Sequence, residues 1–144
     1  MGFIDQITGI GGQFLPASAL QARAEALYAL FPILRERRRA AASSLSGGQR
    51  KMLGIAKALA GEPRLLVMDE PSAGLSPILV KEVVAALRRL RDGGQSLLIA
   101  EQNVKFLELA DRVYTLDGGR IGFCGSVAQM HENDALRRAY FGLR

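Results

Sequence analysis

The sequence has few of the residues that would tie the chain to an oxidising compartment or to the interior of a membrane. Only one of its 144 residues, Cys124, is a cysteine, so no internal disulfide can form. No positively charged and then apolar leader opens the chain. The longest apolar runs, at residues 65–68 and 97–100, are far shorter than the roughly 18 residues that cross a bilayer. The sequence therefore predicts a protein of the reducing cytoplasm that reaches a membrane only through a partner.

The basic residues do not gather in one patch, and histidine and cysteine, which often bind metals, occur once each. The chain has 19 Lys and Arg against 14 Asp and Glu, and the basic residues are spread over clusters such as 35–39 and 88–91. This distribution permits nucleic-acid binding without indicating it, so we expect no nucleic-acid partner. The only histidine, His131, has no acidic or cysteine cluster near it and is expected at the surface rather than in a metal site. Cys124 is expected to pack.

The composition that is present is that of an ordinary globular protein. Hydrophobic residues make up 49% and charged residues 23%, which predicts one domain. Residues 1–17 combine glycines with a proline and have no period, so they are assigned to an irregular leader, and residues 18–144 to the domain. Apolar residues at spacings of three and four predict a helix capped by Ser18 and broken at Pro32. A second helix is predicted after Ser46.

The middle of the chain alternates strands and helices. The apolar run 65–68, bounded by prolines, predicts a strand buried on both faces, as in a parallel sheet. Ser76 followed by Pro77 predicts a helix start, and residues 97–100 predict a second buried strand. Beyond it the pattern predicts a short helix over 104–110, a hairpin of strands 113–116 and 121–124, and helical turns after Ser126. The predicted fold class is α/β, with a mostly parallel sheet, a C-terminal antiparallel hairpin and flanking helices.

The first motif that can carry chemistry is LSGGQR at residues 45–50, where the second helix begins. Backbone N–H groups and the helix dipole favour an anion at such a place. Gly47 and Gly48 would let the backbone approach a phosphate closely, while Ser46 and Gln49 would add a hydroxyl donor and an amide donor. The alternative is a serine-capped helix beside a flexible loop, with no ligand.

The second motif is an acidic pair, Asp69 and Glu70, at the carboxyl end of the predicted strand 65–68. Ligands of open α/β sheets bind at that end. One carboxylate there can help to hold Mg²⁺, and its neighbour can polarise a water for attack on a phosphate. Adjacent side chains of a strand point to opposite sides, so both could serve one site only if the backbone turned, as Pro71 suggests. The alternative is a solvated acidic pair at a strand end.

Together these motifs resemble the ATP-binding subunit of ABC transporters, a family with a P-loop NTPase fold. Residues 45–49 match its LSGGQ signature, and residues 65–70 match its Walker B strand. Residues 71–77 resemble its D-loop, although Ser76 stands where aspartate is usual. Gln102 stands where the family has its switch histidine. A glutamine amide can donate a hydrogen bond to the γ-phosphate but cannot carry its proton.

Three further segments narrow the resemblance. The Glu-Gln-Asn sequence at 101–103, the turn at 117–120 and the segment 136–143 are similar to the ATPase of branched-chain amino acid importers. The ATPase of a urea importer would look much alike. The resemblance covers about residues 22–143.

The resemblance implies cofactors, roles and partners. The cofactors would be ATP and Mg²⁺, with Asp69 as the Mg²⁺-linked carboxylate and Glu70 as the general base. Gln102 would sense the γ-phosphate, and residues 46–49 would clamp a nucleotide held by a second ABC ATPase subunit. Further partners would be transmembrane permease subunits and, indirectly, a solute-binding protein. The chain would then lie at the inner face of the cell membrane, held there by the permease.

The family's Walker A loop has no counterpart in this sequence. The loop needs a Gly-Lys dipeptide, and the chain contains none. The 44 residues before Leu45 are too few for the family's upstream strand, helix and glutamine loop, so the resemblance implies the C-terminal portion of a partial domain. The strand 65–68 would then lack its neighbour. This predicts exposed apolar faces and marginal stability or self-association.

Two other functions stay open beside an ATP-hydrolysing importer subunit. The missing lysine favours a non-catalytic module that docks on an intact ABC ATPase. An ABC ATPase acting on DNA or ribosomes is less favoured, because the sequence has no coiled-coil insertion and no strong basic face.

Overall fold

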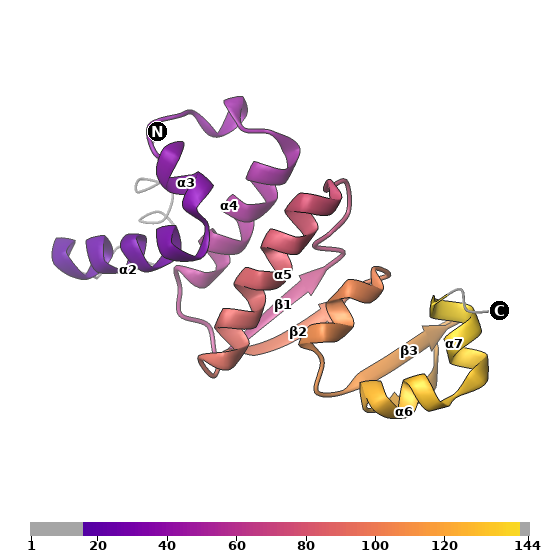
Figure 1. Cartoon of the computed structure of the whole chain (residues 1–144). Coiled ribbons are helices and arrows are strands. Elements are labelled where there is room, and N and C mark those ends of the chain that lie inside the picture. Colours follow the sequence, from indigo (N-terminus) through magenta and orange to yellow (C-terminus); the bar gives the residue numbers. More distant parts are fainter. Residues whose placement is uncertain (1–15, 142–144) are drawn as a thin grey trace. The chain divides into compact units, whose positions relative to one another are not determined.

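The computed structural model describes residues 16–141, which divide between Ala100 and Glu101 into two compact units (Figure 1). The first unit contains α2 (Ala17–Leu30), α3 (Pro32–Glu36), η1 (Ala42–Ser44), α4 (Gly47–Leu59), β1 (Leu65–Asp69), α5 (Pro77–Asp92) and β2 (Ser96–Ala100). The second contains η2 (Val104–Leu109), β3 (Val113–Asp117), β4 (Arg120–Gly125), α6 (Val127–Glu132) and α7 (Asp134–Phe141). Most of the predicted leader, residues 1–15, lies outside the described residues.

The first helices break at proline as predicted, but the first of them begins two residues earlier than predicted. α2 starts at Ala17, with the extended Pro16 at the cap position, so the prediction that Ser18 caps the helix is wrong. The reason is local, because the Pro16 carbonyl already accepts hydrogen bonds from the backbone N–H groups of Ala19 and Leu20. α2 ends at Leu30, and α3 begins afresh at Pro32, whose fixed φ suits a first helical position.

The core of the first unit gathers on α4 and α5. Met52 and Ala56 of α4 and Val83 and Leu87 of α5 are fully buried. Arg23 joins α2 to the residues that follow α4, because its guanidinium donates to the Ala60 carbonyl at 2.6 Å and pairs with Glu62 at 2.7 Å. The N-terminal helices are therefore held to the same core that supports the signature segment.

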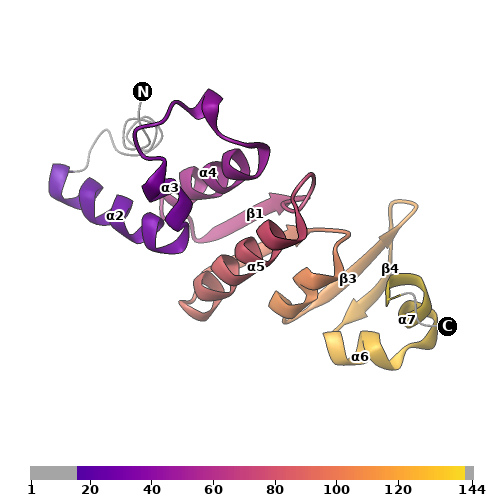
Figure 2. The same ribbon diagram turned by 45° about the horizontal axis from the view of Figure 1, so that its top comes forward.

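The two apolar strands form a parallel pair, as the sequence predicts. β1 pairs with β2, and Val67 lies beside Leu98 and Asp69 beside Ala100. α5 runs alongside both strands in the views of Figures 1 and 2. Ser76 caps this helix as expected, since its hydroxyl accepts from the Leu79 N–H at 3.4 Å. The carboxyl ends of both strands therefore lie at one edge.

The prediction that β1 is buried on both faces is wrong. Leu66 and Met68 are buried, but Leu65 and Val67 on the other face are 49% and 62% exposed, and Leu98 of β2 is 57% exposed. A strand buried on both faces needs a covering layer on each. Among residues 16–141 such a layer covers one face only. This confirms the exposed apolar surface predicted from the missing Walker A strand.

The second unit is built on the predicted antiparallel hairpin. β3 pairs with β4 through a two-residue turn in which Gly118 and Gly119 have φ of 53° and 77°, values that favour glycine. The predicted capping box between Ser126 and Gln129 starts α6, with bonds of 2.9 and 3.2 Å. Cys124 is exposed, so the prediction that it packs is wrong. In a pleated strand it points away from the half-buried neighbours on either side.

The helices and the histidine of the second unit lie close to where the sequence predicts them. The short helix predicted over 104–110 is a 3₁₀ helix over Val104–Leu109. His131 is exposed as expected, and its ring stacks on Phe141 with centroids 4.4 Å apart. The chain ends in helical turns within the described part, α6 and α7.

Candidate functional site: signature helix and acidic turn

The signature residues form a reciprocal cap at the start of α4. The Ser46 hydroxyl oxygen accepts from the Gln49 N–H at 3.2 Å, and the Gln49 amide oxygen accepts from the Ser46 N–H at 3.0 Å. Both side chains thus use an acceptor in the cap, and each keeps donor hydrogens that the cap does not use. From the sequence alone, a serine-capped helix and a phosphate site are alternatives. In this geometry the two are compatible.

The two signature glycines differ in their surroundings. Gly47 is exposed, and a Cβ built on it would have no atom within 4 Å. Gly48 is buried, and a Cβ there would collide with Leu79 and lie 3.2 Å from Leu75. Gly47 therefore leaves room for a ligand beside the backbone. Gly48 instead permits α4 to pack closely against the start of α5, a role that the sequence analysis missed.

The acidic pair lies where β1 ends, and the chain turns at its second member. Asp69 is the last residue of β1, and Glu70 has a φ of +43°. The Glu70 N–H donates to the Ala100 carbonyl at 2.9 Å, and the Glu70 carbonyl accepts from the Ala73 N–H at 3.1 Å. This confirms the predicted turn and places it at Glu70 itself rather than at Pro71. Both carboxylate residues are exposed.

A contact between the two motifs was missed by the sequence analysis. The Lys51 ammonium, on α4, donates to the backbone carbonyl of Glu70. Nothing in the sequence could have found it, because lysine on a polar helix face is common and the acceptor is a main-chain atom 19 residues away. The structure thus brings together the signature helix and the acidic turn within one unit.

Gln102 belongs to the second unit, where the loop after β2 is held by side-chain caps. The Glu101 carboxylate accepts from the backbone N–H groups of Gln102 and Asn103 at 2.8 and 2.9 Å. The Asn103 side chain in turn caps η2 by accepting from the Lys105 N–H at 3.1 Å. Gln102 itself is exposed. Of the predicted site residues, it is the one that does not share a unit with the others.

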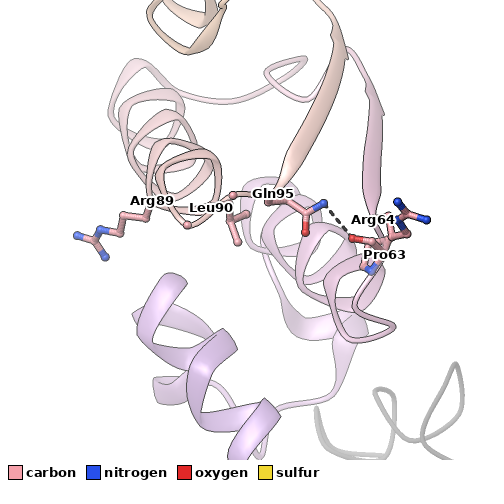
Figure 3. A pocket seen from close by; sticks show the side chains of 7 residues that line it. Pro63, Arg64, Arg89, Leu90 and Gln95 are labelled. Atoms are coloured by element: carbon pink, nitrogen blue, oxygen red, sulfur yellow. Dashed lines mark hydrogen bonds between the residues drawn. The ribbon is translucent and has the colours of Figure 1, made fainter.

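A hollow lies at the other end of the strands. Pro63 and Gln95 precede β1 and β2, and the Gln95 amide donates to the Pro63 carbonyl at 3.0 Å (Figure 3). Arg64 and Arg89 also line it but point away from each other (Figure 3). Ligands of open parallel sheets bind at the carboxyl ends of the strands, so the acidic turn is the better candidate.

The described residues fit a Mg²⁺-phosphate ligand in part. Mg²⁺ is commonly held by one or two carboxylates together with substrate phosphates, and Asp69 suits that use. Among residues 16–141 no three His, Cys, Asp or Glu side chains cluster as a self-sufficient metal site. The donors of Ser46 and Gln49 suit a phosphate. The sequence contains no Gly-Lys dipeptide that could form a Walker A cradle.

Comparison with known proteins agrees with these motifs. The family described as ABC transporter matches residues 5–73, which include the signature and the acidic pair and begin within the segment assigned to the leader. The chain is 37% identical over 140 residues to the high-affinity branched-chain amino acid transport ATP-binding protein BraG of Pseudomonas aeruginosa. It is 36% identical over 123 residues to the probable branched-chain amino acid transport ATP-binding protein LivF of Archaeoglobus fulgidus.

These matches cover most of this chain but only part of each relative. The alignments include 96% and 84% of this chain, and the chain spans 60% of the length of BraG and 52% of LivF. No helix among the described residues is long and apolar enough to span a bilayer. Among solved structures, cbiO1 of Clostridium perfringens has the same fold, with a TM-score of 0.80, 24% identity, and coverage of 96% of this chain and 56% of that one. The chain therefore resembles the ABC ATPases over most of its length and, among them, the branched-chain amino acid transport ATP-binding proteins.

Proposed function

We propose that this chain belongs to an ATP-binding and ATP-hydrolysing subunit that energises an ABC importer of branched-chain amino acids. The observation that carries the proposal is the capped start of α4. There Ser46 and Gln49 keep donor hydrogens beside the open Gly47. The relatives named for branched-chain amino acid transport support the choice of solute. A urea importer is the nearest alternative solute class.

In this proposal the two motifs act on different nucleotides. Residues 46–49 clamp the phosphates of an ATP held by a second ABC ATPase subunit. Asp69 would hold Mg²⁺, which would neutralise phosphate charge, at a nucleotide cradled by a Walker A loop, and Glu70 would accept the proton of the attacking water. Gln102 donates its amide hydrogen bond to the γ-phosphate. The exposure of both carboxylate residues leaves them accessible to such a ligand.

The proposed partners follow from the same assignment. They are a second ABC ATPase subunit, transmembrane permease subunits and, indirectly, a solute-binding protein. The chain would sit in the cytoplasm at the inner face of the cell membrane, bound to the permease. No nucleic-acid partner is proposed.

A second candidate function is a non-catalytic module that docks on an intact ABC ATPase. The observation that favours it is the lack of any Gly-Lys dipeptide, without which the chain supplies no lysine to the β- and γ-phosphates. In that case Ser46 to Gln49 would still clamp the partner's nucleotide, while Asp69 and Glu70 would have none of their own.

The test joins an upstream Walker A segment from an intact ABC ATPase to this chain and measures ATP hydrolysis and ATP binding. We expect Glu70→Gln to lower hydrolysis by at least about a hundredfold, as loss of a general base does, with binding retained. Glu82→Gln, an exposed glutamate on α5, is the control and should change neither. Unchanged turnover in Glu70→Gln would remove this residue from its role. Absent hydrolysis in the unsubstituted fusion would favour the non-catalytic module.

A further inference from the structure

Two contacts join the start of α4 to the acidic turn. The half-buried Lys51 donates from its ammonium group to the Glu70 carbonyl, and Gly48 packs against Leu75 and Leu79, which follow the turn. The two contacting residues of α4 are separated by less than one helical turn. The signature end of this helix and the segment that carries Glu70 are therefore mechanically connected within one unit.

The backbone of Glu70 depends on such support. Its φ of +43° lies in the left-handed region, which side chains other than glycine adopt at a cost. Its N–H is held by the Ala100 carbonyl at 2.9 Å, while its carbonyl accepts from the Ala73 N–H at 3.1 Å and from Lys51. Of these three bonds, only the one from Lys51 comes from outside the strand edge and the turn itself.

We propose that Lys51 is a positioning residue that couples phosphate binding at the signature to the placement of the Glu70 carboxylate. The inference rests on the proposed function and adds a regulatory link to its site. Lys51 lies five residues after Ser46 on one rigid helix, about 7.5 Å along its axis. A phosphate held by Ser46 and Gln49 fixes the start of α4. Through the bond from Lys51, the bound phosphate then favours the left-handed backbone conformation of Glu70 over other conformations of that residue.

The chemistry of the contact defines the variants that test it. Lys51→Met removes all three ammonium donors while keeping most of the apolar stem. Lys51→Arg keeps a cationic donor and should restore the contact. Lys57→Met is the matched control, because Lys57 is half-buried on the same helix six residues later and no bond joins it to the acidic turn within residues 16–141.

The first readout is amide hydrogen exchange in the full 144-residue chain, without nucleotide. A hydrogen bond from a charged donor predicts that Lys51→Met speeds exchange of the Ala73 amide about tenfold or more, while amides in the core of α5 keep their rates. Lys51→Arg should exchange like the original chain, and so should Lys57→Met. A uniform rise across the unit, or no change at Ala73, would overturn the positioning role.

The second readout adds Mg²⁺-ATP and an intact partner ATPase. We expect the Ala73 amide to exchange more slowly in the unsubstituted chain and not in Lys51→Met, although both retain nucleotide in the mixture. Equal slowing in the two chains would overturn the coupling. If neither mixture retains more nucleotide than the partner alone, the proposed function fails, and the coupling fails with it. The exchange rates measured without nucleotide then decide the positioning role by themselves.

Discussion

Ser46 should perform two separable tasks, and one substitution can divide them. In the structure its hydroxyl oxygen caps α4, whereas its hydroxyl hydrogen is the group proposed to bind phosphate. Aspartate caps helices about as well as serine does, so Ser46→Asp should change the free energy of unfolding by less than about 0.5 kcal/mol. Ser46→Ala loses the cap bond and should cost about 1 kcal/mol.

The order of the two variants should reverse when nucleotide retention is measured instead of stability. Ser46→Asp replaces a donor with a carboxylate. At about 4 Å from a phosphate charge, with an effective dielectric constant near 20, it would oppose binding by about 4 kcal/mol. We therefore expect a loss of about a hundredfold or more in retention of Mg²⁺-ATP by the mixture with an intact partner ATPase. Ser46→Ala should lose only the hydrogen bond, about tenfold.

The assay pairs urea unfolding, followed by circular dichroism, with nucleotide retention on the same samples. Ser126→Ala is the control, because it removes an equivalent cap from α6 without touching the proposed phosphate site. It should cost about 1 kcal/mol of stability and leave retention unchanged. The reasoning is refuted if Ser46→Asp retains nucleotide as well as the unsubstituted chain, or if it unfolds as easily as Ser46→Ala.

Three further predictions follow from the fold. Val67→Thr should reduce self-association, measured by sedimentation, and leave the urea midpoint nearly unchanged, because this side chain is 62% exposed on an apolar face; an equally associated variant would contradict this. Gly119→Ala should cost about 1–2 kcal/mol in urea unfolding, because its φ is 77°, and a neutral result would argue against this turn. Burial raises the pKa of Tyr28 above 10, so its contribution to stability is complete below about pH 10 and is lost as the pH rises through the raised pKa. Tyr28→Phe should therefore flatten the fall of the urea midpoint between pH 10 and pH 12, and an unchanged slope would contradict it.

The features that sequence reasoning predicted correctly are those fixed by local chemistry. The capping box at Ser126 depends on residues three apart, and the hairpin depends on two adjacent glycines. The turn at the acidic pair follows from the need to leave a strand. The parallel pairing of β1 with β2 follows from two apolar runs separated by a helix.

The features that it missed depend on partners distant in the sequence. An apolar run cannot reveal how many layers cover it, which is why Val67 was predicted buried and is exposed. The period of a hairpin strand does not say which face is covered, and Cys124 lies on the open one. The bond from Lys51 to the Glu70 carbonyl joins residues that only the packing of α4 brings together.

The placement of the site residues could be predicted only in part for the same reason. The signature residues and the acidic pair lie in one unit because α4, β1 and α5 share a core. Gln102 follows β2 by two residues but belongs to the next unit. Its proposed contact with the γ-phosphate therefore depends on the sequence resemblance rather than on a shared core.

The signature of this chain is proposed to clamp a nucleotide held by another subunit. The most direct measurement is a Mg²⁺-ATP titration of the purified 144-residue chain alone and then mixed with an intact partner ATPase. We expect no saturable binding to the chain alone and tighter retention of nucleotide in the mixture, and we expect Ser46→Asp to abolish that retention. Saturable binding to the chain alone, or a mixture that retains no more nucleotide than the partner does, would contradict it.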